Sequence, residues 1–76
     1  MTVSEITYND LAQYLVIDEI APPDQILLKT LKDVAVAFII GQTGLTEAEL
    51  DEYPDFVIVV YILVQDMYDN RIILLI

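Results

Sequence analysis

The sequence predicts an all-α protein, a small bundle of three main helices plus a short capped helical turn. Apolar residues recur at intervals of three and four in three segments, at about residues 8–15, 22–40 and 54–70. Capping residues or prolines begin these segments, and proline or glycine lies between them. We find no repeat and no long linker, so we expect residues 1–76 to form one domain.

The first helix is expected over about residues 8–15. Thr7 can accept a hydrogen bond from the amide of Asp10, and the Asp10 side chain can act as a shorter form of the returning glutamate in a capping box. Ile6 and Leu11 fall at the two positions of a hydrophobic staple. Because this helix is short, we expect it to dock on another element.

The second helix is expected from the proline pair at residues 22–23 to about Ile40, because proline is well tolerated in a first turn. Gly41 and Gly44 provide the stop signal. The predicted apolar stripe comprises Leu27, Leu31, Val34 and Phe38, with Leu28, Ala35 and Ile39 beside it. The predicted solvent side carries Lys29, Lys32 and Asp33.

The clearest local signal is Thr46-Glu47-Ala48-Glu49, a complete S/T-x-x-E capping box. Leu45 and Leu50 again occupy the staple positions. We expect one helical turn after Thr46. Tyr53 should end it, because a residue that precedes proline is disfavoured in the helical conformation.

The segment from Pro54 to about Asn70 admits two interpretations. Residues 56–64 are rich in β-branched side chains and could form a buried strand, but the length and the proline start favour a helix. Such a helix would be apolar all round, which implies burial on two sides. We expect one side to pack within the subunit and the other against a neighbour.

Composition excludes several classes of function. The chain is 57% hydrophobic and 21% charged, and its thirteen acidic and three basic residues give a formal net charge of −10. Such a charge opposes binding to nucleic acid and to anionic membranes. The absence of cysteine and histidine removes disulfides, thiolate metal sites and the commonest general base. Neither long apolar run reaches the roughly 20 residues of a membrane span, and the first residues lack a secretory signal, so we expect an intracellular protein.

The carboxylates are interpreted as solvated groups. The cluster formed by Glu47, Glu49, Asp51, Glu52 and Asp55 lacks the spacing and the turn glycine of a calcium loop. Asp66 and Asp69 share a helix face, but no nucleophile or histidine accompanies them. We therefore predict a protein without catalytic, cofactor-binding or metal-binding residues, which is not an enzyme.

Two surfaces are predicted instead. The candidate oligomer interface comprises Val59, Tyr61, Ile62, Tyr68 and Arg71. The candidate acidic face comprises Glu47, Glu49, Asp66 and Asp69. Tyrosine is frequent at interfaces, yet a tyrosine can equally well edge a small core, and for the five tyrosines both interpretations stay open.

Several blocks of sequence carry a resemblance to a known family. They are Ile6-Thr7, Tyr14-Leu15 followed by Ile17-Asp18, Pro23-Asp24, Thr43-Gly44-Leu45, Asp51-Glu52-Tyr53-Pro54-Asp55 and Asp66-Met67-Tyr68-Asp69-Asn70-Arg71. In this order they resemble the head-tail connector, or adaptor, family of tailed bacteriophages and prophages, over about residues 5–71. The apolar stretch Ile72–Ile76 departs from that pattern, and we assign it no role.

The resemblance implies a single helical connector-type domain that forms a ring of about twelve or thirteen copies beneath the portal. Its partners would be other copies of the same chain, the portal protein, and neighbouring head-completion or tail proteins. DNA would pass through the ring without specific binding. The protein would reside in the virion at the head-tail junction, and in the host cytoplasm during assembly. The resemblance implies no cofactor and no catalytic residue.

A second hypothesis competes with the connector. Small size and a charge of −10 also fit an acidic inhibitor that mimics DNA and occupies the basic cleft of a partner protein. A mimic would stay small in solution, whereas a connector would form large cyclic species. A small enzyme or metal protein is a remote third hypothesis, because histidine and cysteine are missing.

Overall fold

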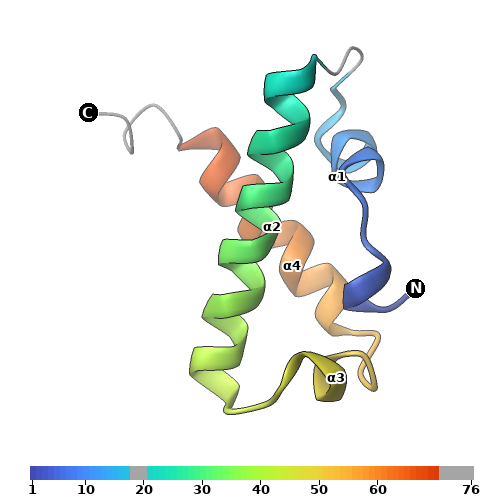
Figure 1. Ribbon diagram of the computed structural model, residues 1–76, viewed down its shortest axis with the longest axis vertical. Coiled ribbons are helices and arrows are strands. Elements are labelled where there is room, and N and C mark those ends of the chain that lie inside the picture. Colours follow the sequence, from blue (N-terminus) through green and yellow to red (C-terminus); the bar gives the residue numbers. More distant parts are fainter. Residues whose placement is uncertain (18–20, 71–76) are drawn as a thin grey trace.

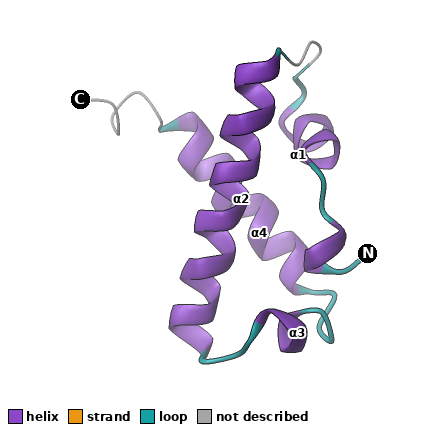
Figure 2. Cartoon of the chain, viewed as in Figure 1, coloured by secondary structure: helices purple, strands orange, loops and turns teal. Residues whose placement is uncertain are grey.

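The helices predicted from the sequence are present in the computed structural model, which describes residues 1–17 and 21–70. Its elements in chain order are a 3-10 turn η1 (Val3–Glu5) and the helices α1 (Tyr8–Leu15), α2 (Pro22–Thr43), α3 (Glu47–Leu50) and α4 (Phe56–Asp69). The described residues contain no strand, as Figure 2 shows. The prediction of an all-α bundle with three main helices and a short capped turn is therefore confirmed.

The bundle is organised around α2, its longest helix. Helix α4 crosses α2 near its middle, α1 lies beside the N-terminal half of α2, and α3 lies below the crossing, near η1 (Figure 1). The core lies among these elements. Its buried side chains are Val3, Ile6, Leu11, Ala12, Leu28, Leu31, Ala35, Val36, Ile39, Leu50, Val60 and Val64.

Both predicted capping boxes are present. The Thr7 hydroxyl accepts a hydrogen bond from the Asp10 amide at 3.2 Å, and the Thr7 amide donates to the Asp10 carboxylate at 2.9 Å. Thr46 and Glu49 exchange the corresponding bonds at 3.2 and 3.1 Å. Each box satisfies amides that have no partner within the helix, and so it sets where α1 and α3 begin.

Helix α2 is longer than predicted. It ends at Thr43 instead of about Ile40, so Gly41 lies inside the helix. The actual stop is Gly44, which adopts the left-handed conformation with φ 74° and donates its amide to the Ile40 carbonyl at 2.9 Å. A glycine ends a helix only where the chain takes this conformation, and of the two glycines only Gly44 does so.

The buried face of α2 also differs from the predicted stripe. Leu31 is buried as expected, but Val34 and Phe38 are 48% and 55% exposed. The face is rotated toward Lys32 and Val36, because α1 and the preceding Ile6 lie on that side. Lys32, predicted to face solvent, is half-buried and donates its ammonium to a main-chain carbonyl. The apolar arc of α2 is wider than one packing face, so periodicity alone does not place the core.

Helix α4 confirms the helical interpretation of the last segment, although it begins at Phe56, two residues after Pro54. The intervening residues form turns, in which the Phe56 amide donates to the Tyr53 carbonyl at 3.0 Å. Val60 and Val64 are completely buried against the core. Over the described residues, no helix has both the length and the apolar character needed to cross a membrane.

Candidate functional site

The side of α4 that points away from the core forms an exposed apolar surface with an acidic end. This surface, the outer face of α4, comprises Ile58, Val59, Ile62, Asp66 and Asp69. Ile58 is 62% exposed and Ile62 is 54% exposed, whereas Val60 and Val64 on the opposite side of the helix are fully buried. Large aliphatic side chains exposed together on one helix face are typical of a surface that meets a partner.

The predicted interface residues divide between two sides of α4. Val59, which is 39% exposed, lies with Ile62 on the outer face. Tyr61 and Tyr68 instead are partly buried against the subunit's own core. Arg71 lies outside the described residues.

Tyr61 has its contacts within the subunit. Its ring centroid lies 4.9 Å from that of Tyr14, with the ring planes tilted by 34°, and its hydroxyl donates to the Met1 sulfur at 3.6 Å. Burial raises the pKa of the Tyr61 phenol, and the negative charge of Asp10 raises it further. This tyrosine therefore joins α4 to α1 and the N-terminus.

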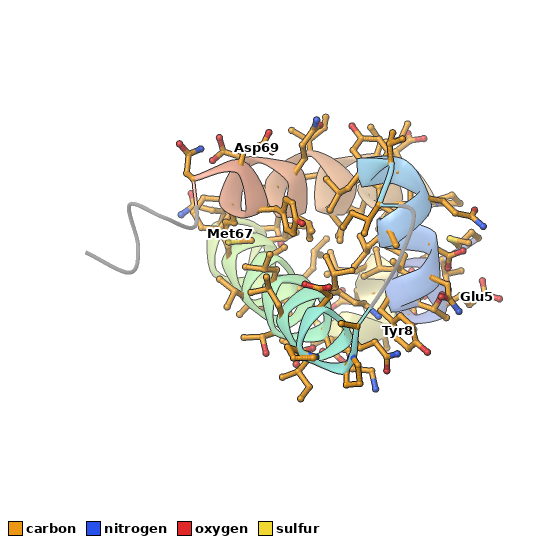
Figure 3. The ribbon with its side chains drawn as sticks, turned by 90° about the horizontal axis from the view of Figure 1, so that it is seen from above. Glu5, Tyr8, Met67 and Asp69 are labelled. Carbon is orange, nitrogen blue, oxygen red and sulfur yellow. The ribbon has the colours of Figure 1, made fainter. Side chains whose placement is uncertain are left out.

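The four predicted acidic-face residues form two separate pairs. Glu47 and Glu49 are exposed on α3, whereas Asp66 and Asp69 lie near the far end of α4 (Figure 1). Figure 3 shows Asp69 projecting from the side of α4 that faces away from α2. No group of three or more acidic side chains within residues 1–17 and 21–70 is arranged to hold a metal ion.

Asp51, which the sequence placed in a solvated acidic rim, has a structural partner. The hydroxyl and the amide of Ser4 donate to its carboxylate at 2.5 and 2.9 Å. These hydrogen bonds lower the pKa of Asp51, and the positive charge of Lys32 lowers it further. Sequence reasoning missed this contact because 47 positions separate the two residues. It ties η1 to the end of α3.

A hollow between α1 and α2 gathers the only two lysines of the sequence. This lysine pocket, of about 360 Å³, is lined by Ile6, Thr7, Tyr8, Leu11, Lys29, Lys32 and Asp33. The Lys29 ammonium lies 5.6 Å from the centroid of the Tyr8 ring, within range of a cation–π interaction. The Lys32 ammonium donates to the Ile6 carbonyl at 2.9 Å. Neither lysine forms an ion pair with another described residue.

A second apolar hollow lies between α2 and α4, next to the outer face. This α2/α4 groove, of about 270 Å³, is lined by Val34, Ala35, Phe38, Leu63, Asp66 and Met67. Figure 3 shows Met67 at the junction of the two helices. The exposed Phe38, a member of the predicted apolar stripe of α2, forms part of this groove. Apolar surface therefore continues from α4 onto α2.

No protein-family model, curated protein or solved structure matches this chain.

Proposed function

We propose that the protein is a structural subunit of the head-tail connector of a tailed phage or prophage. In this proposal its copies form a ring beneath the portal protein, next to head-completion or tail proteins, in the virion. The outer face of α4 carries the proposal. Ile58 and Ile62 are more than half exposed on a helix whose other side already completes the core.

The energetics favour a neighbour on this surface. Burying an isoleucine side chain completely contributes about 1.5–3 kcal/mol, so two half-exposed isoleucines leave a sizeable gain unrealised in the isolated subunit. A chain of 76 residues has a thin stability margin and benefits from association. Helical content and the lysine-poor surface agree with the connector resemblance, which supplies the ring and its position in the particle.

The outer face also weighs against the acidic-inhibitor hypothesis. A mimic of DNA needs a continuous acidic surface that replaces the phosphates. On α4 the carboxylates of Asp66 and Asp69 stand beside three exposed aliphatic side chains. This mixture of acidic and apolar side chains suits a general protein-protein contact better than binding in the place of DNA in a basic cleft.

Native mass spectrometry tests the proposed function. At high protein concentration the unaltered chain is expected to give cyclic species of about twelve or thirteen subunits, because copies of one asymmetric contact close into a ring. Repeating the measurement with a portal protein of a related phage tests assembly on that platform. A chain that stays monomeric under both conditions and binds a nuclease instead would contradict the connector and support the inhibitor.

The same ring is expected not to bind duplex DNA. Each subunit carries a formal charge of −10, so the ring repels phosphates and lets DNA slide through without being held. A gel-shift titration at about 50 mM salt measures this, because phosphate contacts are strong at that salt concentration. A shifted complex that dissociates as the salt concentration rises would contradict the prediction that DNA passes through the ring without being bound.

A further inference from the structure

We propose that neighbouring copies meet head to tail, with the outer face of α4 of one copy seated on the lysine pocket of the next. The inference rests on the proposed function, because it names the two surfaces through which the ring would close. Neither surface is covered by another part of its own subunit. The two surfaces have complementary charges, each has an apolar part, and they lie on different sides of the subunit.

The charges of the two surfaces are complementary. The acidic end of the outer face is formed by Asp66 and Asp69, both exposed. The lining of the lysine pocket contains Lys29 and Lys32, the only two lysines of a strongly acidic chain, and one carboxylate, that of Asp33, while Asp51 acts on Lys32 from outside this lining. Lys29 is exposed, and its ammonium lies over the Tyr8 ring without an ion-pair partner among the described residues, so it can receive a carboxylate from a neighbouring copy.

The apolar parts also correspond. The buried side chains of Ile6 and Leu11 and the half-buried Tyr8 line the lysine pocket. Its volume of about 360 Å³ accommodates an aliphatic side chain from a neighbour. On the outer face, Ile58 and Ile62 are the side chains that would enter such a hollow. A contact of this kind has an apolar centre and a charged rim, as protein interfaces commonly do.

The two surfaces lie on different sides of the subunit. In Figure 3, Asp69 projects from α4 at one side, and Tyr8 lies at the opposite side, where α1 meets α2. A contact between two different surfaces on opposite sides repeats from copy to copy, and it closes into a ring when the rotation permits. This geometry fits a ring better than a dimer.

Charge favours a second copy of the chain as the partner that binds at the lysine pocket. Two copies of a chain with a charge of −10 repel each other at most places on their surfaces, and the lysine pocket is where an acidic helix is attracted. Packing α4 against a parallel α4 would bring four carboxylates together, two Asp66 and two Asp69, and antiparallel packing would leave the lysines out of the contact. Docking on the α2/α4 groove would place those carboxylates beside Asp66 of the neighbour. Head-to-tail packing avoids both repulsions.

Charge reversal tests the pairing. One variant carries Lys29→Glu and Lys32→Glu, so both of its surfaces are acidic. The other carries Asp66→Lys and Asp69→Lys, so both of its surfaces are basic. Each variant alone is expected to lose at least about tenfold in association constant, because like charges then meet in every contact. Circular dichroism and urea midpoints establish that each variant is folded.

An equimolar mixture of the two variants is expected to assemble again, because each contact in it joins an acidic to a basic surface. The rings must alternate, so native mass spectrometry should find equal numbers of the two variants and only even ring sizes. If Lys32→Glu prevents folding by removing the bond to the Ile6 carbonyl, the pair Lys29→Glu with Asp69→Lys replaces the double variants.

The outcomes separate this inference from the proposed function. Recovery of rings in the mixture supports the head-to-tail contact. The head-to-tail contact would be refuted if folded variants assemble alone like the parent, or if the mixture stays dissociated while the parent forms rings. Neither result would contradict the proposed connector function. A parent chain that forms no ring, alone or with a portal protein, would overturn both.

Discussion

Replacing Ile62 by glutamate is expected to leave the subunit folded and to abolish its higher oligomers. Ile62 is 54% exposed on the outer face of α4, so the new carboxylate remains hydrated in the isolated subunit. In an assembled ring it would take the place of the isoleucine in the apolar part of the contact, so the contact would lose apolar burial and the carboxylate would lose hydration. Circular dichroism should therefore show an unchanged helical signal, and sedimentation should show monomers at concentrations where the parent assembles.

Two further variants sharpen this experiment. Ala37→Glu adds the same charge at an exposed position of α2 that lines neither proposed contact surface, and it should assemble like the parent. Val59→Glu should act in the same direction as Ile62→Glu, because Val59 is 39% exposed on the same face. Loss of folding in both α4 variants, or normal assembly of folded Ile62→Glu, would refute a partner-facing role of this surface.

Replacing Leu28 by alanine is expected to produce the largest loss of stability. Leu28 is completely buried in the part of α2 that faces the core. Removing a buried leucine costs about 2–5 kcal/mol, the sum of lost apolar transfer and of the cavity that remains. Native proteins in general are stable by only about 5–15 kcal/mol, and small domains lie at the low end, so the variant should unfold at a much lower urea concentration.

Ile26→Ala is the matched control for this variant. Ile26 lies in the same helix, two positions earlier, and is 68% exposed, so its truncation should shift the urea midpoint little. Equal losses of stability in the two variants would show that the core is not centred on the face of α2 that carries Leu28. Both proteins should be compared as monomers, because assembly adds its own stabilisation.

Local signals in the sequence predicted the helices well. The capping boxes that begin at Thr7 and Thr46 join residues only three positions apart, so their hydrogen bonds do not depend on the rest of the fold. The stop of α2 was less predictable, because Gly41 and Gly44 carry the same signal and only the folded chain selects one. The buried face of α2 was misplaced for a similar reason, since the packing of α1 and α4 on α2 decides it.

The candidate surfaces were predictable in part. An apolar surface all round α4 led directly to Val59 and Ile62, because a helix can bury only one side in a small bundle. The lysine pocket and the bond between Ser4 and Asp51 were not predictable. Both require elements that are distant in sequence to lie side by side, and no local pattern encodes such contacts.

The crossing of α2 and α4 has a consequence for the symmetry of a ring. Successive copies differ in orientation by about 30° in a ring of twelve and by about 28° in a ring of thirteen. The outer face belongs to α4 and the lysine pocket to α1 and α2, so in the proposed ring the inclination of α4 relative to α1 and α2 would contribute to this angle. At the crossing, Ala35 of α2 is buried in one core with Val60 of α4. A small change in the packing of these two helices would therefore alter the angle between neighbouring copies in the proposed ring.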